Sequence, residues 1–317
     1  MTDRKPTIDD VTNRIQAIRS EVRKRIVGQE QVVDQVLACL LCDGNALLES
    51  TPGLGKTLLV RTLAEVTDLS FSRIQNTPDL MPSDVIGTEM VRETETGRSF
   101  TFEKGPVFAN LVLSDEINRA TPKTQSALLE AMEEGQVTAG NETYDLPEPF
   151  FVLATQNPID QEGTYPLPEA QSDRFLMKIL VDYPDAEAER EIVDRYTRDV
   201  DSSVSVEQRV STGQLRQMQQ LTHQVPIADD LRDTAVDLVR ETRTADDLEY
   251  GASPRASMSL VRAAKARALV EGRTHVSSED VTAMAVPVLR HRVVVDFRAE
   301  REGLAPDDVI EALVADR

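Results

Sequence analysis

The chain has few of the residue types that mark secreted, disulfide-rich or membrane proteins. Its 317 residues include two cysteines, no tryptophan and 4% aromatic residues, which excludes a disulfide scaffold. The longest apolar run, residues 36–42, is far shorter than the ~20 residues that a membrane span requires. Residues 1–6 are charged and have no apolar stretch behind them, so we expect no secretory signal. The expectation is a cytoplasmic protein without a membrane span.

Lysine is also scarce, and the chain is strongly acidic. Lys and Arg number 35 against 55 Asp and Glu, a net charge of −20, and seven of the basic residues are lysines. This composition is typical of salt-loving archaea, whose proteins stay soluble through net charge. An ordinary acidic cytosolic protein is the alternative. So acidic a surface binds phosphate backbones poorly, and we expect no nucleic-acid partner.

Buried strands and helices alternate in the first part of the chain. Short apolar runs predict strands at residues 46–48, 71–74, 111–113, 150–154 and 176–181. Helical periodicity predicts helices at residues 8–26, 30–42, 56–67 and 122–134. This alternation predicts an α/β fold, a largely parallel sheet flanked by helices. Two hairpin inserts, at residues 90–102 and 136–146, interrupt it.

The pattern changes after the last predicted strand. Helices are predicted at residues 185–197, 213–222, 228–243, 254–271 and 277–290. We therefore expect an α/β domain over residues 1–182 and a small all-α domain over residues 183–317. A C-x-x-C pair, Cys39 and Cys42, lies in an apolar helix, so buried core thiols are favoured over redox chemistry.

A glycine-rich loop follows the first predicted strand and begins the next helix. The segment STPGLGKT starts at Ser50 and matches the phosphate-loop pattern G-x-x-x-x-G-K-S/T, except that Ser50 replaces the first glycine. Gly53 and Gly55 let backbone N–H groups turn toward phosphate oxygens at the positive helix end. Lys56 can then reach the β- and γ-phosphates, and Thr57 can bind Mg²⁺. A chance Gly/Pro turn is the alternative.

Polar residues end two further strands. Asp115 and Glu116 end the predicted strand that begins with the apolar run 111–113, and the carboxyl end of a buried parallel strand lies at the ligand crevice of a doubly wound sheet. Asp115 can hold Mg²⁺ through water, and Glu116 can act as the base for an attacking water. Asn157, at the end of another strand, can orient that water. The non-functional alternatives are a pair of solvated carboxylates for Asp115 and Glu116 and, for Asn157, a turn before Pro158.

These motifs together resemble the AAA+ ATPases, and within them the MoxR family, over about residues 8–300. The matching stretches are residues 26–30 (IVGQE), 74–84 (IQNTPDLMPSD), 102–106 (FEKGP), 113–132 (LSDEINRATPKTQSALLEAM), 154–158 (ATQNP), 162–175 (EGTYPLPEAQSDRF) and 253–255 (SPR). The resemblance implies a P-loop AAA+ core followed by a helical lid, and ATP hydrolysis with ATP and Mg²⁺ as cofactors.

The resemblance also implies roles for single residues. Glu116 belongs to the Walker B pair, Asn157 matches sensor 1, Arg174 the arginine finger that reaches a neighbour's γ-phosphate, and Arg255 sensor 2. An ion pair of Arg174 with Asp173 or Glu169 is the structural alternative. The implied nucleotide-binding residues are Val27, Gly28, Pro52, Gly53, Leu54, Gly55, Lys56, Thr57, Leu58 and Asp115, with Thr57 and Asp115 at the metal. Arg119 lies in a family motif without an assigned role, and Ser50 is the departure from the family pattern.

The implied function is an ATP-driven, chaperone-like machine that remodels or matures a protein partner. The resemblance implies a homo-oligomeric ring, a hexamer, and a partner with a von Willebrand factor A domain. The ATPase subunit of a metal chelatase is an alternative. A nucleic-acid motor is a weaker one, since residues 136–146 contain no Lys or Arg. The intact Asp115-Glu116 pair argues against a further alternative, a nucleotide switch that does not hydrolyse ATP.

Overall fold

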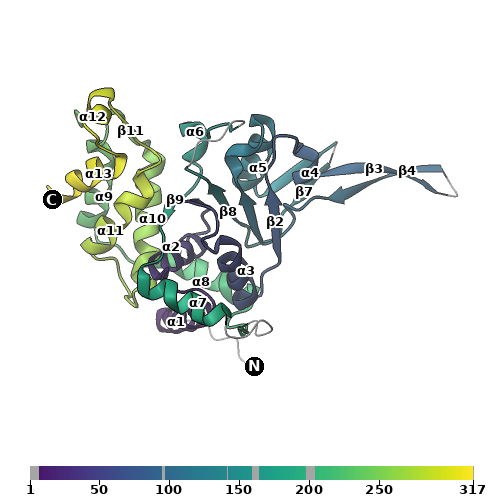
Figure 1. Ribbon diagram of the computed structural model, residues 1–317, viewed down its shortest axis with the longest axis horizontal. Helices are drawn as coiled ribbons and strands as arrows, with labels where there is room; N and C mark the ends of the chain where they lie inside the picture. The colour runs from purple at the N-terminus through teal and green to yellow at the C-terminus, as the bar shows by residue number, and fades with distance from the viewer. Residues whose placement is uncertain (1–6, 95–96, 141, 159–163, 198–203, 317) are drawn as a thin grey trace.

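The fold is built on a five-stranded parallel sheet. The computed structural model describes residues 7–94, 97–140, 142–158, 164–197 and 204–316 (Figure 1). The strand order is β2-β5-β8-β1-β9. The strand bounds are β1 (Ala46–Ser50), β2 (Phe71–Gln75), β5 (Leu111–Asp115), β8 (Phe151–Gln156) and β9 (Met177–Val181). Every neighbouring pair is parallel, which confirms the α/β class expected from the sequence.

Helices cover both faces of this sheet because its strands are apolar on both sides. Leu48 of β1 belongs to one apolar cluster and its neighbour Leu47 to the other, as alternation along a strand requires. The first cluster includes α1 (Ile8–Arg23), α2 (Glu30–Leu41), α3 (Lys56–Thr67) and lid helices. The second includes α4 (Pro82–Ile86) and α5 (Pro122–Glu134). The larger cluster thus runs from the sheet into the helical part of the chain.

Polar side chains cap several of the described helices. Thr7 and Asp10 form a capping box at α1, with the Thr7 side chain accepting from the Asp10 N–H. Ser253 caps α10 (Pro254–Val270), which has proline at its first position. Cys39 and Cys42 are free thiols in the core, and burial raises the pKa of Cys42 to about 12. The prediction of buried core thiols is confirmed.

Both predicted hairpins form. One consists of β3 (Gly87–Thr94) and β4 (Gly97–Lys104), the other of β6 (Gln136–Ala139) and β7 (Glu142–Asp145). Phe102 stacks on Tyr144 at a centroid distance of 4.3 Å and so joins the two hairpins. The β3–β4 hairpin projects from the body (Figure 1). The expected turn residues Thr96 and Asn141 lie outside the described residues.

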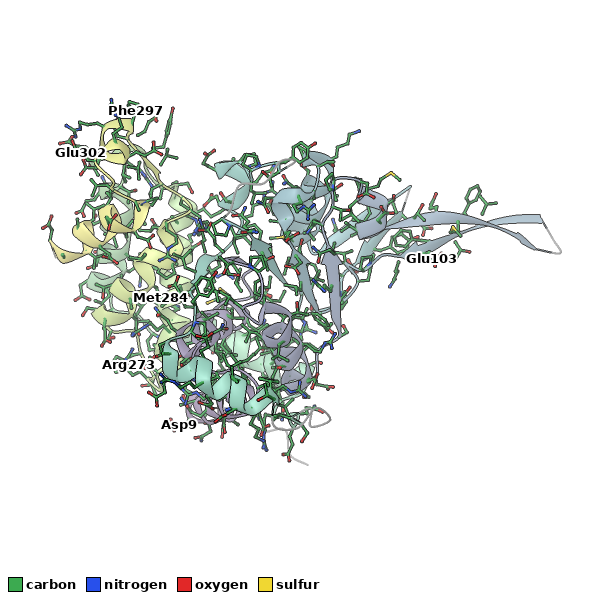
Figure 2. All side chains as sticks on the ribbon, in the orientation of Figure 1. Asp9, Glu103, Arg273, Met284, Phe297 and Glu302 are labelled. Carbon is green, nitrogen blue, oxygen red and sulfur yellow. The ribbon has the colours of Figure 1, made fainter. Side chains whose placement is uncertain are left out.

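The part of the chain after β9 is mainly helical. Its helices are α7 (Ala186–Thr197), α8 (Thr212–Gln224), α9 (Asp229–Glu241), α10, α11 (Ser278–Leu289), α12 (Phe297–Arg301) and α13 (Pro306–Ala315). A short antiparallel ribbon of β10 (Leu248–Tyr250) and β11 (Val294–Val295) is an addition that the sequence does not predict. Figure 2 shows Phe297 of this part and Glu103 of the β3–β4 hairpin on opposite sides of the molecule. The division after residue 182 stays a prediction.

The described helices offer no candidate for a membrane span, because none combines the necessary length with sufficiently apolar composition.

Candidate active site

Three neighbouring strands end at one edge of the sheet. The strand β8 lies between β1 and β5, so the segments that follow these three strands lie side by side. They are the glycine-rich loop after β1, Glu116 after β5 and Asn157 after β8. This is the arrangement expected from the sequence, with the half-buried Asn157 between the loop and the acidic pair.

The glycine-rich loop leads directly into α3. Gly53 and Gly55 have φ angles of +89° and +75°, which side-chain-bearing residues rarely adopt. A Cβ atom at either glycine would meet nothing within 4 Å. Gly55 is the N-cap of α3 and supplies no side-chain hydrogen bond, so the first N–H groups of α3 need other acceptors.

Ser50 fits its place without the freedom of glycine. It is the last residue of β1, is buried, and pairs with Val181 of β9. Its Oγ donates to the Thr51 carbonyl at 3.2 Å. Among the described residues other than glycine, only Asp43, Asp68 and Glu116 have a positive, left-handed φ angle, so Ser50 does not. The serine therefore causes no backbone strain where the family pattern has glycine.

Lys56 lies over this loop. Its Nζ donates to the carbonyls of Ser50 and Thr51, each at 3.4 Å. Burial lowers the pKa of Lys56, and the negative charges of Asp115 and Glu116 act in the opposite direction. The lysine and the two carboxylates are thus close enough to interact, although they come from different strand ends.

Asp115 is held by two residues that the sequence analysis did not single out. Its Oδ1 accepts a hydrogen bond from Thr155 Oγ1 at 2.6 Å, and its Oδ2 accepts one from Arg73 Nη2 at 2.6 Å. Thr155 also accepts from the Glu116 N–H at 2.9 Å. Thr155 lies in the stretch ATQNP that matches the family, so the sequence contained a pointer to it. Arg73 becomes a neighbour of Asp115 only through the pairing of β2 with β5.

Glu116 has a φ of +55°, a left-handed conformation that costs about 1–3 kcal/mol for a residue with a side chain. Its Oε2 accepts from Gln75 Nε2 at 3.3 Å and from Arg119 Nη1 at 3.2 Å. The residue that the sequence left without a role, Arg119, therefore pairs with Glu116. Such backbone strain in a residue at a strand end is typical of functional positions.

The residues present fit a bound nucleotide with Mg²⁺. The uncapped start of α3 offers N–H donors to phosphate oxygens. The buried Oγ1 of Thr51 has no hydrogen-bond partner among the described residues, which leaves a polar atom of the loop unsatisfied. The Thr57 hydroxyl and the Asp115 carboxylate are the oxygen donors that Mg²⁺ prefers. The described residues contain no cluster of three His, Cys, Asp or Glu that could hold a metal by itself.

The loop between α1 and α2 contacts the phosphate loop. Gly28 has a φ of +69°, and a Cβ atom there would lie 2.5 Å from the Ala188 Cβ of α7. Val27 is half-buried beside it. Gln29 Nε2 donates to the Leu54 carbonyl at 3.0 Å, a contact that the sequence did not predict. Val27 and Gly28, two of the implied nucleotide-binding residues, therefore lie in a loop that contacts the phosphate loop.

Arg174 and Arg255 share one carboxylate. Arg174 Nη1 lies 2.5 Å from Glu133 Oε2, and Arg255 Nη2 lies 3.0 Å from Glu133 Oε1. Arg174 thus has an ion-pair partner within its own chain, but that partner is Glu133 and not Asp173 or Glu169, the carboxylates expected in the structural alternative; the Asp173 carboxylate binds Arg292. The two arginines come together although they are far apart in the chain.

This pair lies at the opposite edge of the sheet from the phosphate loop. Arg174, Arg255 and Glu133 line a cavity of about 310 Å³ together with residues 43–45, which directly precede β1. The phosphate loop follows the other end of β1, and a five-residue strand spans about 16 Å. Within one copy of the chain, the arginines and the phosphate loop are therefore on different surfaces.

The comparisons with known proteins agree with this geometry. Residues 45–177 match the family described as "ATPase family associated with various cellular activities (AAA)", and residues 240–313 match the AAA lid domain. The chain is 47% identical over 304 residues to Chaperone MoxR1 of Mycobacterium tuberculosis, covering 93% of this chain and 79% of that protein. The chain belongs to the MoxR family of AAA+ ATPases.

Other relatives agree with this MoxR assignment. Protein MoxR of Methylorubrum extorquens is 32% identical over 316 residues, which cover 90% of each chain. A crystal structure described as that of a "putative ATPase" from Cytophaga hutchinsonii has a TM-score of 0.89 and 43% identity, and covers 96% of this chain and 94% of that one. This MoxR-family chain is thus a nucleotide-binding enzyme that hydrolyses ATP.

Proposed function

We propose that two adjacent copies of this chain, in a ring, together form each site of ATP hydrolysis. The observation that supports this most directly is the joint ion pairing of Arg174 and Arg255 with Glu133, at the sheet edge opposite the phosphate loop. A ring is closed by head-to-tail contacts, in which one surface of a copy meets a different surface of the next. Such a contact brings the arginines of one copy to the phosphates held by its neighbour. We propose a hexamer as the ring.

Within one copy, the strand ends supply the remaining groups. Lys56 and the first N–H groups of α3 bind the β- and γ-phosphates. Thr57 and, through water, Asp115 would hold Mg²⁺, which supplies positive charge to the phosphates when bound. Glu116 takes the proton of the attacking water, and Asn157 orients that water. Glu133 keeps both arginines together until the neighbour's phosphates replace it.

We further propose that hydrolysis drives remodelling or maturation of a protein partner. The exposed apolar side chains on the β3–β4 hairpin support this: Met90 is 46% exposed, Val91 54% and Phe100 71%. Val91 and Phe100 are direct cross-strand partners, so they form one apolar surface on a projecting element. A protein with a von Willebrand factor A domain is the proposed partner class.

The two hairpins do not favour a nucleic-acid motor. The segment of residues 87–104 carries four acidic and three basic residues, and residues 136–146 carry two acidic and no basic residues. One of the basic residues, Lys104, lies 4.9 Å from the ring centroid of Phe108. A channel for single strands needs a positively charged groove, which these hairpins do not supply.

Mixed rings test the shared site. Arg174→Ala and Glu116→Gln should each bind ATP and each lose turnover, by about a thousandfold for the finger. In a ring assembled from equal amounts of the two variants, half of the copies have an intact Glu116 and the other half have an intact Arg174. About one quarter of the interfaces therefore join a pocket with intact Glu116 to a neighbour with intact Arg174. The mixture should therefore regain about one quarter of wild-type ATPase activity. If native mass spectrometry confirms co-assembly and the mixture still has no ATPase activity, the shared site is refuted.

The partner proposal has its own test. Purified von Willebrand factor A-domain protein from the same organism should bind the ATP-loaded Glu116→Gln variant and stimulate the wild-type ATPase. Phe100→Ser should leave the basal ATPase unchanged, because the hairpin lies away from the phosphate loop, and should weaken stimulation. Stimulation that is equal for wild type and Phe100→Ser would exclude the hairpin as the contact surface.

A further inference from the structure

The lid residue Arg292 contacts the chain on both sides of Arg174. Arg292 is 8% exposed and follows α11. Its Nε donates to Asp173 Oδ1 at 2.6 Å, and its Nη2 donates to the carbonyls of Asp173 at 3.0 Å and Phe175 at 2.6 Å. Its Nη1 donates to the Leu176 carbonyl at 3.1 Å. One buried guanidinium thus binds the residue before Arg174 and the two residues after it.

Its neighbour His291 adds to this contact. The His291 Nε2 lies 3.1 Å from the Phe175 carbonyl, so Nε2 carries the proton that is donated. Burial, together with the charge of Arg292, lowers the pKa of His291 well below its usual value, and the imidazole is neutral. The Ser172 Oγ donates to the Glu169 carbonyl at 3.0 Å and lies 3.4 Å from the His291 carbonyl. Two adjacent residues of the lid turn, His291 and Arg292, therefore donate hydrogen bonds to the segment that carries Arg174.

The second arginine is tied to the same carboxylate. Ser253 Oγ donates to Asp173 Oδ2 at 3.2 Å, and Ser253 is the N-cap of α10, two residues before Arg255. Asp173 thus accepts from Arg292 on one oxygen and from Ser253 on the other. Because Arg174 directly follows Asp173 and Arg255 closely follows Ser253, this carboxylate fixes the spacing of the two arginines.

A planar guanidinium suits this task. Its N–H donors point in fixed directions, so several acceptors bound at once are held at fixed relative positions. A buried cation also requires all of these acceptors, since loss of one leaves a desolvated charge without compensation. The backbone from Asp173 to Leu176 is therefore defined by a residue of the lid, more than a hundred positions later in the chain.

We propose that Arg292 is a positioning residue for ATP hydrolysis by the neighbouring copy. From the lid, it fixes the segment at Asp173–Leu176 so that Arg174 and Arg255 project together toward the next phosphate site. The lid and the two arginines then move as one unit. A change in the lid of one copy consequently alters catalysis in the neighbouring copy. This inference rests on the proposed shared site and adds the residue that positions it.

The decisive measurement is whether Arg292→Gln impairs the ATP site of its own copy or that of the neighbouring copy. Arg292→Gln should bind ATP like wild type and lose about a hundredfold in turnover, the effect of displacing a reacting group by about 1 Å. Mixed with Glu116→Gln, it should regain activity, because its own pocket is intact and its neighbour supplies an intact arginine pair. Mixed with Arg174→Ala, it should stay inactive, because both variants then lack a functional finger.

A purely structural role would reverse this pattern. If Arg292→Gln damages its own nucleotide pocket, activity will return with Arg174→Ala and not with Glu116→Gln, which would overturn the proposal. If Arg174→Ala itself fails to complement Glu116→Gln, the shared site and this inference both fall. If Arg174→Ala complements and Arg292→Gln does not, the shared site stands and this inference alone is wrong.

Two further variants keep the test informative. Arg290→Gln is the matched control, since Arg290 lies two residues away and pairs with Asp307 of α13 at 2.7 Å, away from Arg174. It should keep near wild-type turnover in every mixture. Asp173→Asn is the milder partner variant for use if Arg292→Gln does not fold. It keeps the size of the side chain, weakens the contact to Arg292, and should complement Glu116→Gln in the same way.

Discussion

The buried carboxylate of Glu21 gives a stability prediction with a defined pH range. Glu21 is 1% exposed in α1 and accepts from Lys24 at 2.7 Å, from Arg209 Nε at 2.8 Å and from the Glu207 N–H at 3.1 Å. Burial alone would raise the pKa of Glu21, but the hydrogen bonds from Lys24, Arg209 and Glu207 outweigh it and lower the pKa to about 2. These contacts hold the segment before α8 against α1.

The size of the effect follows from this pKa. A shift from 4.5 to about 2 corresponds to about 3 kcal/mol of stabilisation by the charged form. Lys24 and Arg209 are 42% and 38% exposed, so solvent screening reduces the expected value to about 2 kcal/mol. Since the pKa is lowered by folding, the stabilisation is complete above pH 4.5 and is lost as the pH falls from 4.5 toward 2.

Urea unfolding of wild type and Glu21→Gln tests this reasoning. At pH 7 and fixed salt, Glu21→Gln should lower the free energy of unfolding by about 2 kcal/mol, and the difference should shrink below pH 4.5. Glu207→Gln is the control, because the Glu207 carboxylate is 70% exposed and pairs with the same Arg209, so its loss should cost less than about 0.5 kcal/mol. A difference between wild type and Glu21→Gln that is constant from pH 7 to pH 3 would refute the charge-based account.

Three predictions concern the nucleotide and the ring. Lys56→Ala should abolish ATP binding in a calorimetric titration, since it removes the cation over the phosphate loop. Glu116→Gln should bind ATP and lose turnover. Equal ATP affinity for wild type and Lys56→Ala would exclude this loop as the nucleotide site. Ser50→Gly should change ATP affinity by less than about tenfold, or ~1.4 kcal/mol, because Ser50 has an unstrained backbone; a larger change would give its side chain a role. Ring assembly and ATPase activity should rise together from low toward molar salt, because copies with a charge of −20 repel one another. Stable hexamers in low-salt sedimentation runs would contradict this last prediction.

The sequence by itself determined the elements and the phosphate site. Hydrophobic periodicity gave the helices and strands of the α/β core, and capping residues such as Thr7 and Ser253 stand where helices begin. The glycine-rich loop and the acidic pair at the end of β5 were readable because each is a local pattern after an apolar strand. Such signals act over a few residues, so a single sequence carries them in full.

Tertiary packing alone decided which charged groups meet. Arg174 and Arg255 join at Glu133, Arg73 binds Asp115, and Arg292 binds the segment around Arg174. These partners are about 40 to 120 positions apart, and nothing in the local pattern of either residue selects the other. Their choice depends on strand order, helix packing and the docking of the lid on one continuous core. An arginine binds any carboxylate within reach, so only the fold determines which carboxylate that is.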